Sequence, residues 1–196
     1  LVESLAKTRY LSVDTFRAST AAACLAAGAR MINDISALRF DTTMADVVRE
    51  HGARLVLMYS KETGEAPHAS KRARHYDDLI SEIGDFLETR IEYALRRGIS
   101  EDRLIVDPGM GAFVSIDGND SWELLAGLDR LRSRFHSLPM LVGTSRKGFL
   151  GGPLQERDPL SQLTALIATL KGATILRTHN PAMAKQFLES WQRTMG

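Results

Sequence analysis

Six short apolar segments of the sequence each end in side chains that can bind a small molecule. In chain order, these side chains are Asp14, Asn33, Met58, Asp107, the run Ser145-Arg146-Lys147, and Arg177 with His179. Aspartate and asparagine can accept and donate hydrogen bonds to a flat, amino-substituted heterocycle. Arginine, lysine and histidine beside a glycine-rich stretch suit an anionic phosphate ligand. The residue types therefore predict a site for a polar ring and a phosphate.

Each of these residues also has a purely structural interpretation. Asp14 can cap the following helix, and Asn33 can belong to a turn. Asp107 precedes Pro108 and Gly109, a common turn sequence. Since all six segments end in groups capable of directional recognition, we favour a shared binding site over six separate caps and turns.

The elements that must position these residues alternate along the chain. The apolar segments cover residues 9–15, 30–36, 54–60, 103–109, 139–145 and 174–180. Segments with helical periodicity follow them, at 20–29, 42–53, 76–98, 121–133, 158–173 and 180–193. The pattern predicts an α/β fold with a parallel sheet, whose strand ends meet at one rim. We expect the chain to form a single domain, residues 1–196.

Two closures of such a sheet compete, an open doubly wound sheet and an eight-stranded TIM barrel. The sequence contains six expected strands in 196 residues, whereas a (β/α)8 barrel typically needs about 250 residues. The chain does not begin with Met and opens in what resembles the end of a helix. Two βα units lost before this point would make up the difference, so spacing alone leaves the barrel and the open sheet equally open.

Composition argues against several classes of function. The net charge is +1, which disfavours a nucleic-acid surface. No apolar run approaches the roughly 20 residues of a membrane span, and we expect no membrane partner. The single cysteine, Cys24, excludes an internal disulfide and suits a cytoplasmic location. Neither a P-loop, a dinucleotide-binding glycine motif nor zinc-ligand spacing is present.

The strand-end motifs, taken together, resemble those of a known family. "LSVDT", "INDIS", "LVLMYS", "IVDPGMG", "LVGTSRKGFLG" and "ILRTHN" are similar, in this order, to the strand ends of dihydropteroate synthases. The resemblance implies a (β/α)8 pterin-binding barrel, of which this chain holds strands three to eight. It implies a transferase of folate biosynthesis that joins 6-hydroxymethyl-7,8-dihydropterin diphosphate to p-aminobenzoate, releasing diphosphate. It also implies Mg²⁺, whose protein ligand is expected in the absent N-terminal part.

The resemblance assigns roles to individual residues. Asp14, Asn33, Asp107 and Lys147 would bind the pterin, and Met58 and Gly143 would line its flat pocket. Arg177 and His179 would hold the diphosphate as it leaves, so Lys147, Arg177 and His179 are the expected catalytic residues. Ser145 would meet the p-aminobenzoate carboxylate. The family usually forms homodimers through its late helices, to which Leu163, Leu166 and Leu170 can contribute, and it is the target of sulfonamides.

The chain departs from the family pattern in two motifs. After "DPG" the family commonly continues with Phe-Gly and a lysine, whereas this chain has "MGAFVS", in which Phe113 is a substitute aromatic residue. The segment that usually ends in Met-His ends in Met58-Tyr59. Two alternatives therefore stay open: a pterin-binding barrel of the methyltransferase type, and a non-catalytic homologue that acts as a partner subunit.

Overall fold

The computed structural model describes residues 1–61 and 74–195, in which six parallel strands follow one another in chain order. The strands are β1 (Ser12–Asp14), β2 (Met31–Asp34), β3 (Arg54–Met58), β4 (Leu104–Asp107), β5 (Leu141–Val142) and β6 (Ile175–Leu176). Strands β1 to β4 form one sheet and β5 pairs with β6. A single bridge between Val106 and Met140 joins the two sheets.

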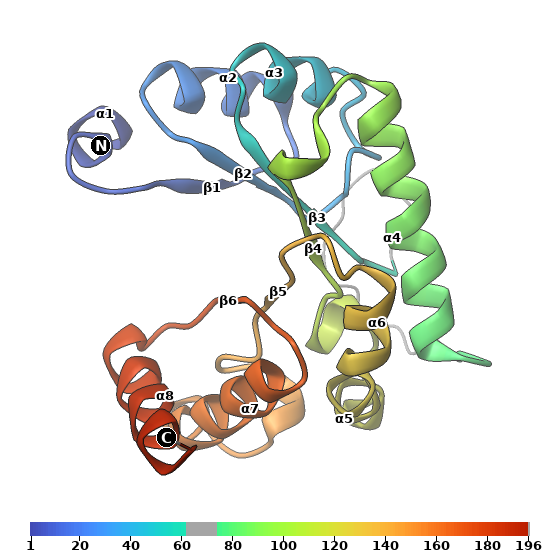
Figure 1. Ribbon diagram of the computed structural model, residues 1–196, viewed down its shortest axis with the longest axis vertical. Coiled ribbons are helices and arrows are strands. Elements are labelled where there is room, and N and C mark those ends of the chain that lie inside the picture. Colours follow the sequence, from blue (N-terminus) through green and yellow to red (C-terminus); the bar gives the residue numbers. More distant parts are fainter. Residues whose placement is uncertain (62–73, 196) are drawn as a thin grey trace.

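Helices precede, connect and follow these strands, and those that connect them cover the outside of the sheet. They are α1 (Val2–Ala6), α2 (Ala18–Ala26), α3 (Met44–Glu50), α4 (Leu79–Arg96), α5 (Gly118–Ala126), α6 (Leu128–Arg134), α7 (Asp158–Leu170) and α8 (Pro181–Met195). Short 3₁₀ helices occupy Glu101–Arg103, Gly111–Phe113, Gly148–Leu150 and Leu154–Glu156. Figure 1 shows the strands as an arc with the helices on its outer side and with β1 and β6 at its two ends.

The order of the strands distinguishes between the two predicted closures. A doubly wound sheet reverses its strand order at a switch point, whereas barrel strands are added in sequence. Here the strands run from β1 to β6 without reversal. The described residues therefore form six parallel strands in the order of a (β/α)8 barrel, and the predicted α/β barrel class is confirmed.

The central strands are buried on both faces, which explains their continuous apolar sequences, whereas β1 and β6 at the two ends of the arc are partly exposed. All four residues of β4 are buried. Val56, Ile105 and Leu141 form a cluster separate from the larger core, with Met31 and Ile175 packed against it. This smaller cluster comes from β2 to β6 and lies on the inner face of the arc. The larger core fills the layer between strands and helices.

Two helical predictions differ from the structure in detail. The helix predicted over 76–98 is α4, Leu79–Arg96; Leu79, Ile83 and Leu87 are buried, whereas Leu95 is 42% exposed and Ala94 faces the core in its place. The single helix predicted over 121–133 is two helices that meet at Gly127. A Cβ atom at Gly127 would lie 2.6 Å from Cδ1 of Ile80, so glycine permits the close approach of α4 at this junction.

Among the described residues, no helix combines the length and apolar content that crossing a membrane requires.

Candidate active site

A pocket of about 350 Å³ lies at the C-terminal ends of the strands, a size typical of small-molecule sites. It is lined by Asp14, Thr15, Phe16, Arg17, Asn33, Ile35, Met58, Phe113, Lys147 and Arg177. Five of the predicted binding residues, Asp14, Asn33, Met58, Lys147 and Arg177, therefore share one pocket, together with Phe113 from the divergent motif. The five come from the ends of β1, β2, β3 and β6 and from the loop after β5, which is the arrangement that parallel strands dictate.

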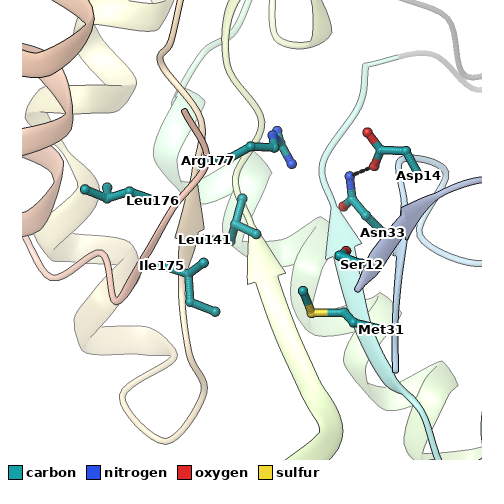
Figure 2. Close-up of a pocket in the computed structure, with 8 residues that line it drawn as sticks. All are labelled: Ser12, Asp14, Met31, Asn33, Leu141, Ile175, Leu176 and Arg177. Atoms are coloured by element: carbon teal, nitrogen blue, oxygen red, sulfur yellow. Dashed lines mark hydrogen bonds between the residues drawn. The ribbon is translucent and has the colours of Figure 1, made fainter. Parts of the chain in front are cut away.

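Asp14 and Asn33 lie side by side because β1 and β2 pair in register, Asp14 opposite Asn33. The Asn33 side-chain amide donates a hydrogen bond to Asp14 Oδ1. Asn33 is buried, and its own Oδ1 has no hydrogen-bond partner among the described residues. Figure 2 shows this pair facing Arg177 across a second cavity of about 310 Å³. The pair thus presents an unused buried acceptor to the interior.

Asp107 is fully buried at the end of β4. The Gly109 N–H donates to its Oδ1 at 2.8 Å. Arg177 Nη2 forms an ion pair with its Oδ2 at 3.1 Å, and Oδ2 has no hydrogen-bond donor among the described residues. Burial raises the pKa of Asp107, and the nearby charges of Arg177 and Lys147 oppose this shift. Asp107 is therefore a carboxylate that can accept a further hydrogen bond.

Arg177 bridges the two sides of the site from the end of β6. Its Nη2 approaches Asp107, while its buried Nη1 has no hydrogen-bond partner in the described part of the chain. Gly143 makes room for this guanidinium: a Cβ atom there would lie 2.9 Å from Nη2 and 3.0 Å from Nε. Gly143 was predicted to line the ligand pocket, and the structure places it against Arg177 instead.

Lys147 reaches the pocket from the loop after β5. Its Nζ lies 4.8 Å from the centre of the Phe113 ring, a cation–π contact. Gly111, at φ +64°, accommodates the lysine stem, because a Cβ atom there would lie 3.3 Å from Lys147 Cδ. Burial, followed by the charge of Arg177, lowers the pKa of Lys147. Phe113, which belongs to the divergent segment "MGAFVS", thus lies beside the amine of Lys147.

Ser145 and His179 are paired with each other rather than with the pocket. Ser145 Oγ lies 2.9 Å from His179 Nδ1 and accepts the His179 backbone N–H at 3.1 Å. Neither residue is among those that line the 350 Å³ pocket. The structure therefore places Ser145 and His179 in contact with each other, outside the set of predicted residues that line the pocket.

Arg146, the middle residue of the Ser-Arg-Lys run, has a structural role. Its guanidinium binds the Asp158 carboxylate through two hydrogen bonds of 2.8 and 3.0 Å, and its backbone has φ +57°. Arg157 donates to the carbonyl groups of Arg146, Gly151 and Gly152. These contacts fix the glycine-rich loop so that Lys147 points inward and Arg146 points to α7.

Sequence reasoning missed four pocket residues: Thr15, Phe16, Arg17 and Ile35. Each lies within three residues after Asp14 or Asn33, so proximity along the chain was a usable signal. Arg17 adds a third cationic group to the pocket. Its guanidinium has no hydrogen-bond or ion-pair partner among the described residues, in contrast to that of Arg177.

The expected Mg²⁺ can be tested against the ligands available. Nowhere in residues 1–61 and 74–195 do three or more His, Cys, Asp or Glu side chains form a group that could hold a metal ion. Asp14 already accepts a hydrogen bond from Asn33, and Asp107 lies 3.1 Å from the positively charged guanidinium of Arg177, which disfavours a cation beside it. These residues do not fit a metal ion held in a cage of protein ligands.

Comparison with known proteins gives a consistent result. A sequence model of the family described as pterin binding enzyme matches residues 1–179. A dihydropteroate synthase of Synechocystis is 34% identical over 89% of this chain and 60% of its own length. A type-1 dihydropteroate synthase of Escherichia coli is 35% identical over 87% of the chain and 62% of its own length. The chain therefore spans about three fifths of these curated relatives.

Solved structures resemble the fold closely. A dihydropteroate synthase from Stenotrophomonas maltophilia with imidazole in its active site superposes with a TM-score of 0.91 at 34% identity, over the whole chain and 73% of that protein. A Xanthomonas albilineans dihydropteroate synthase in complex with 7,8-dihydropteroate superposes with a TM-score of 0.88 at 36% identity, over the whole chain and 71% of that protein.

Proposed function

Because the chain belongs to the pterin binding enzyme family, we propose that it works as a dihydropteroate synthase in folate biosynthesis. The reaction joins 6-hydroxymethyl-7,8-dihydropterin diphosphate to p-aminobenzoate and gives 7,8-dihydropteroate and diphosphate. One observation carries the proposal. Three buried polar atoms at the rim have no hydrogen-bond partner among the described residues: Asn33 Oδ1, Asp107 Oδ2 and Arg177 Nη1. Buried polar groups are normally paired, so these atoms await a polar ligand.

The unpartnered atoms match the two ends of a pterin diphosphate. Asn33 and Asp107 offer acceptors, which suit the amino and ring N–H donors of the pterin. Lys147 offers donors to the oxygen and nitrogen atoms of the ring, and Met58 forms a flat apolar wall. A ligand that lacks the ring N–H donors would leave the two acceptors buried and unpaired, so the site selects against it.

Arg177 lies between the groups assigned to the pterin ring and those assigned to the diphosphate. In the free protein it lies 3.1 Å from Asp107, the residue assigned to the pterin. The N–H groups of the pterin donate to the Asp107 carboxylate in place of Arg177. The guanidinium of Arg177 can then bind the diphosphate. The exposed part of the side chain, 37% of its surface, allows that reorientation. Arg17 and Lys147 supply further positive charge in the same pocket.

The chemistry needs no nucleophilic side chain. Electron release from the dihydropterin ring breaks the bond between the methylene carbon and the diphosphate oxygen, and the electron pair leaves with the diphosphate. The p-aminobenzoate nitrogen then forms the new bond to carbon and loses one proton. The protein positions both substrates and stabilises the leaving charge through Arg177 and His179. Ser145, beside His179, meets the p-aminobenzoate carboxylate.

We assign no step to a metal ion held by this chain. Mg²⁺ is commonly bound through substrate phosphates with few protein ligands, so it can enter with the diphosphate.

We further propose a cytoplasmic homodimer. The single cysteine suits a reducing compartment. Of the predicted contact residues on α7, Leu163 and Leu170 are 46% and 55% exposed and can pack against a second copy, together with Leu160 at 41%, whereas Leu166 is half-buried.

Calorimetric titration tests the assignment of the two ends. Arg177→Ala should weaken binding of the pterin diphosphate by more than tenfold while changing the affinity for the bare pterin far less, because only the former carries the anion. Lys147→Ala should weaken both ligands similarly, since the lysine contacts the shared ring. Equal losses for the two ligands in Arg177→Ala would argue against a diphosphate role for this residue.

A further inference from the structure

The opposite rim of the barrel, where the strands begin, carries a second cluster of cationic residues. Arg30 directly precedes β2, Arg54 is the first residue of β3, and Arg103 directly precedes β4. Because these three strands are parallel neighbours, their first residues meet at the same edge. The Arg54 N–H donates to the Arg30 carbonyl at 3.0 Å.

The three arginines surround a pocket of about 350 Å³. Its lining consists of Tyr10, Ala29, Arg30, His51, Gly52, Ala53, Arg54 and Arg103. The lining contains no carboxylate. The acids nearest along the chain, Glu50 and Asp102, lie outside it, and Glu50 is 3.5 Å from Arg49. Within the described residues, none of the three guanidinium groups has a hydrogen-bond or ion-pair partner.

Small residues shape this pocket. Gly52 has φ +59°, and a Cβ atom there would lie 3.2 Å from Nη1 of Arg103. The missing side chain therefore lets the Arg103 guanidinium lie against the backbone in a half-buried position. Ala29 and Ala53 are buried at 6% and 3% exposure and leave the floor open. Arg30 and Arg54 are exposed around this floor, so all three cationic groups can reach one ligand.

Three like charges around one hollow repel each other, and an anion in the hollow would remove that cost. We propose that this pocket binds an oligophosphate, a small molecule with two or more linked phosphate groups. Guanidinium groups form paired hydrogen bonds with phosphate oxygens, and three of them balance the charge of a diphosphate better than that of a single phosphate. His51 can donate a further hydrogen bond.

This site is distinct from the proposed active site and does not depend on it. Arg54 and Met58 are the first and last residues of β3, so the strand separates the two pockets by about 13 Å. A purely structural explanation also exists. Helices α2 and α3 end near this rim, and cations near helix C-termini are favourable without any ligand. Only the oligophosphate hypothesis predicts saturable binding.

Titration of the protein with sodium diphosphate tests the hypothesis, using Arg177→Ala protein to weaken diphosphate binding at the proposed active site. We expect one binding event per chain, weakened by added KCl. Arg54→Gln and Arg103→Gln should each lower the affinity by about tenfold, the loss of one charge-assisted contact. Arg193→Gln, which removes the same charge from exposed α8, should leave it unchanged.

Thermal unfolding without ligand checks that each variant folds. Arg30→Gln and Arg54→Gln change exposed side chains and provide the test if Arg103→Gln is unstable. Absence of saturable binding, or equal losses in the Arg193 control, would overturn the proposal and leave the helix C-termini as the explanation. Inorganic phosphate binding as tightly as diphosphate would refute the oligophosphate class. Tighter binding of a short single-stranded oligonucleotide would refute a small-molecule site.

Discussion

Substitution of Gly109 tests most directly whether its backbone N–H orients the Asp107 carboxylate in the site. The Gly109 backbone has φ +74°, a region that costs a residue with a side chain about 1–2 kcal/mol. A Cβ atom there would also lie 2.6 Å from the backbone carbonyl oxygen of Tyr59, which cannot move aside as a flexible side chain would. Gly109→Ala therefore must displace the loop, and with it the 2.8 Å hydrogen bond to Asp107.

The expected destabilisation combines the backbone cost with the lost hydrogen bond to a buried charge, which is about 1.5–3 kcal/mol. We expect Gly109→Ala to lower the free energy of unfolding by about 3–5 kcal/mol. Gly152→Ala is the matched control. Gly152 also has a positive φ, +64°, but no atom lies within 4 Å of its added Cβ. This variant should lose only about 1–2 kcal/mol.

Urea unfolding of the two variants measures this difference, and pterin titration measures its consequence for the site. Gly109→Ala should bind pterin at least tenfold more weakly under conditions where it is folded, whereas Gly152→Ala should bind as the unmodified protein does. Equal losses of stability in the two variants would refute the close contact with Tyr59. Unchanged pterin affinity in Gly109→Ala would refute the role of the Gly109 N–H in orienting Asp107.

Two further predictions concern the loop after β5. Because the folded state lowers the pKa of Lys147, the unfolded state binds more protons between that pKa and its ordinary value of about 10.4, and stability should rise with pH across this window. Urea unfolding should show that Lys147→Met abolishes the rise; a rise of the same size in the variant would assign it to another group. Ser145→Ala removes two contacts to His179 and should cost about 1 kcal/mol, with weaker p-aminobenzoate binding. The helix-surface change Ser133→Ala should leave that binding intact, and equal effects of the two variants would remove Ser145 from the site.

The sequence predicted the fold and the rim because both follow from local patterns. Continuous apolar runs marked the doubly buried strands, and parallel pairing then placed Asp14 beside Asn33. The patterns did not decide the order of the strands. The pairing of neighbouring strands decides it, together with the bridge between Val106 and Met140.

What sequence reasoning could not supply was the pairing of side chains across the site. The position of Gly143 against Arg177 depends on how far an arginine from β6 reaches over β5, which no local pattern encodes. The same holds for Arg177 beside Asp107, since these residues are 70 positions apart in the chain. The break at Gly127 was also invisible, because it depends on the approach of Ile80 from another helix.

Formation of 7,8-dihydropteroate from pterin diphosphate and labelled p-aminobenzoate, with Mg²⁺ and the full-length protein, tests the central claim most directly. We predict labelled product that is lost in Lys147→Ala and retained in the Arg193→Gln control. Absence of product from protein that still binds the pterin would contradict the synthase assignment and favour a methyltransferase-type barrel or a non-catalytic partner subunit.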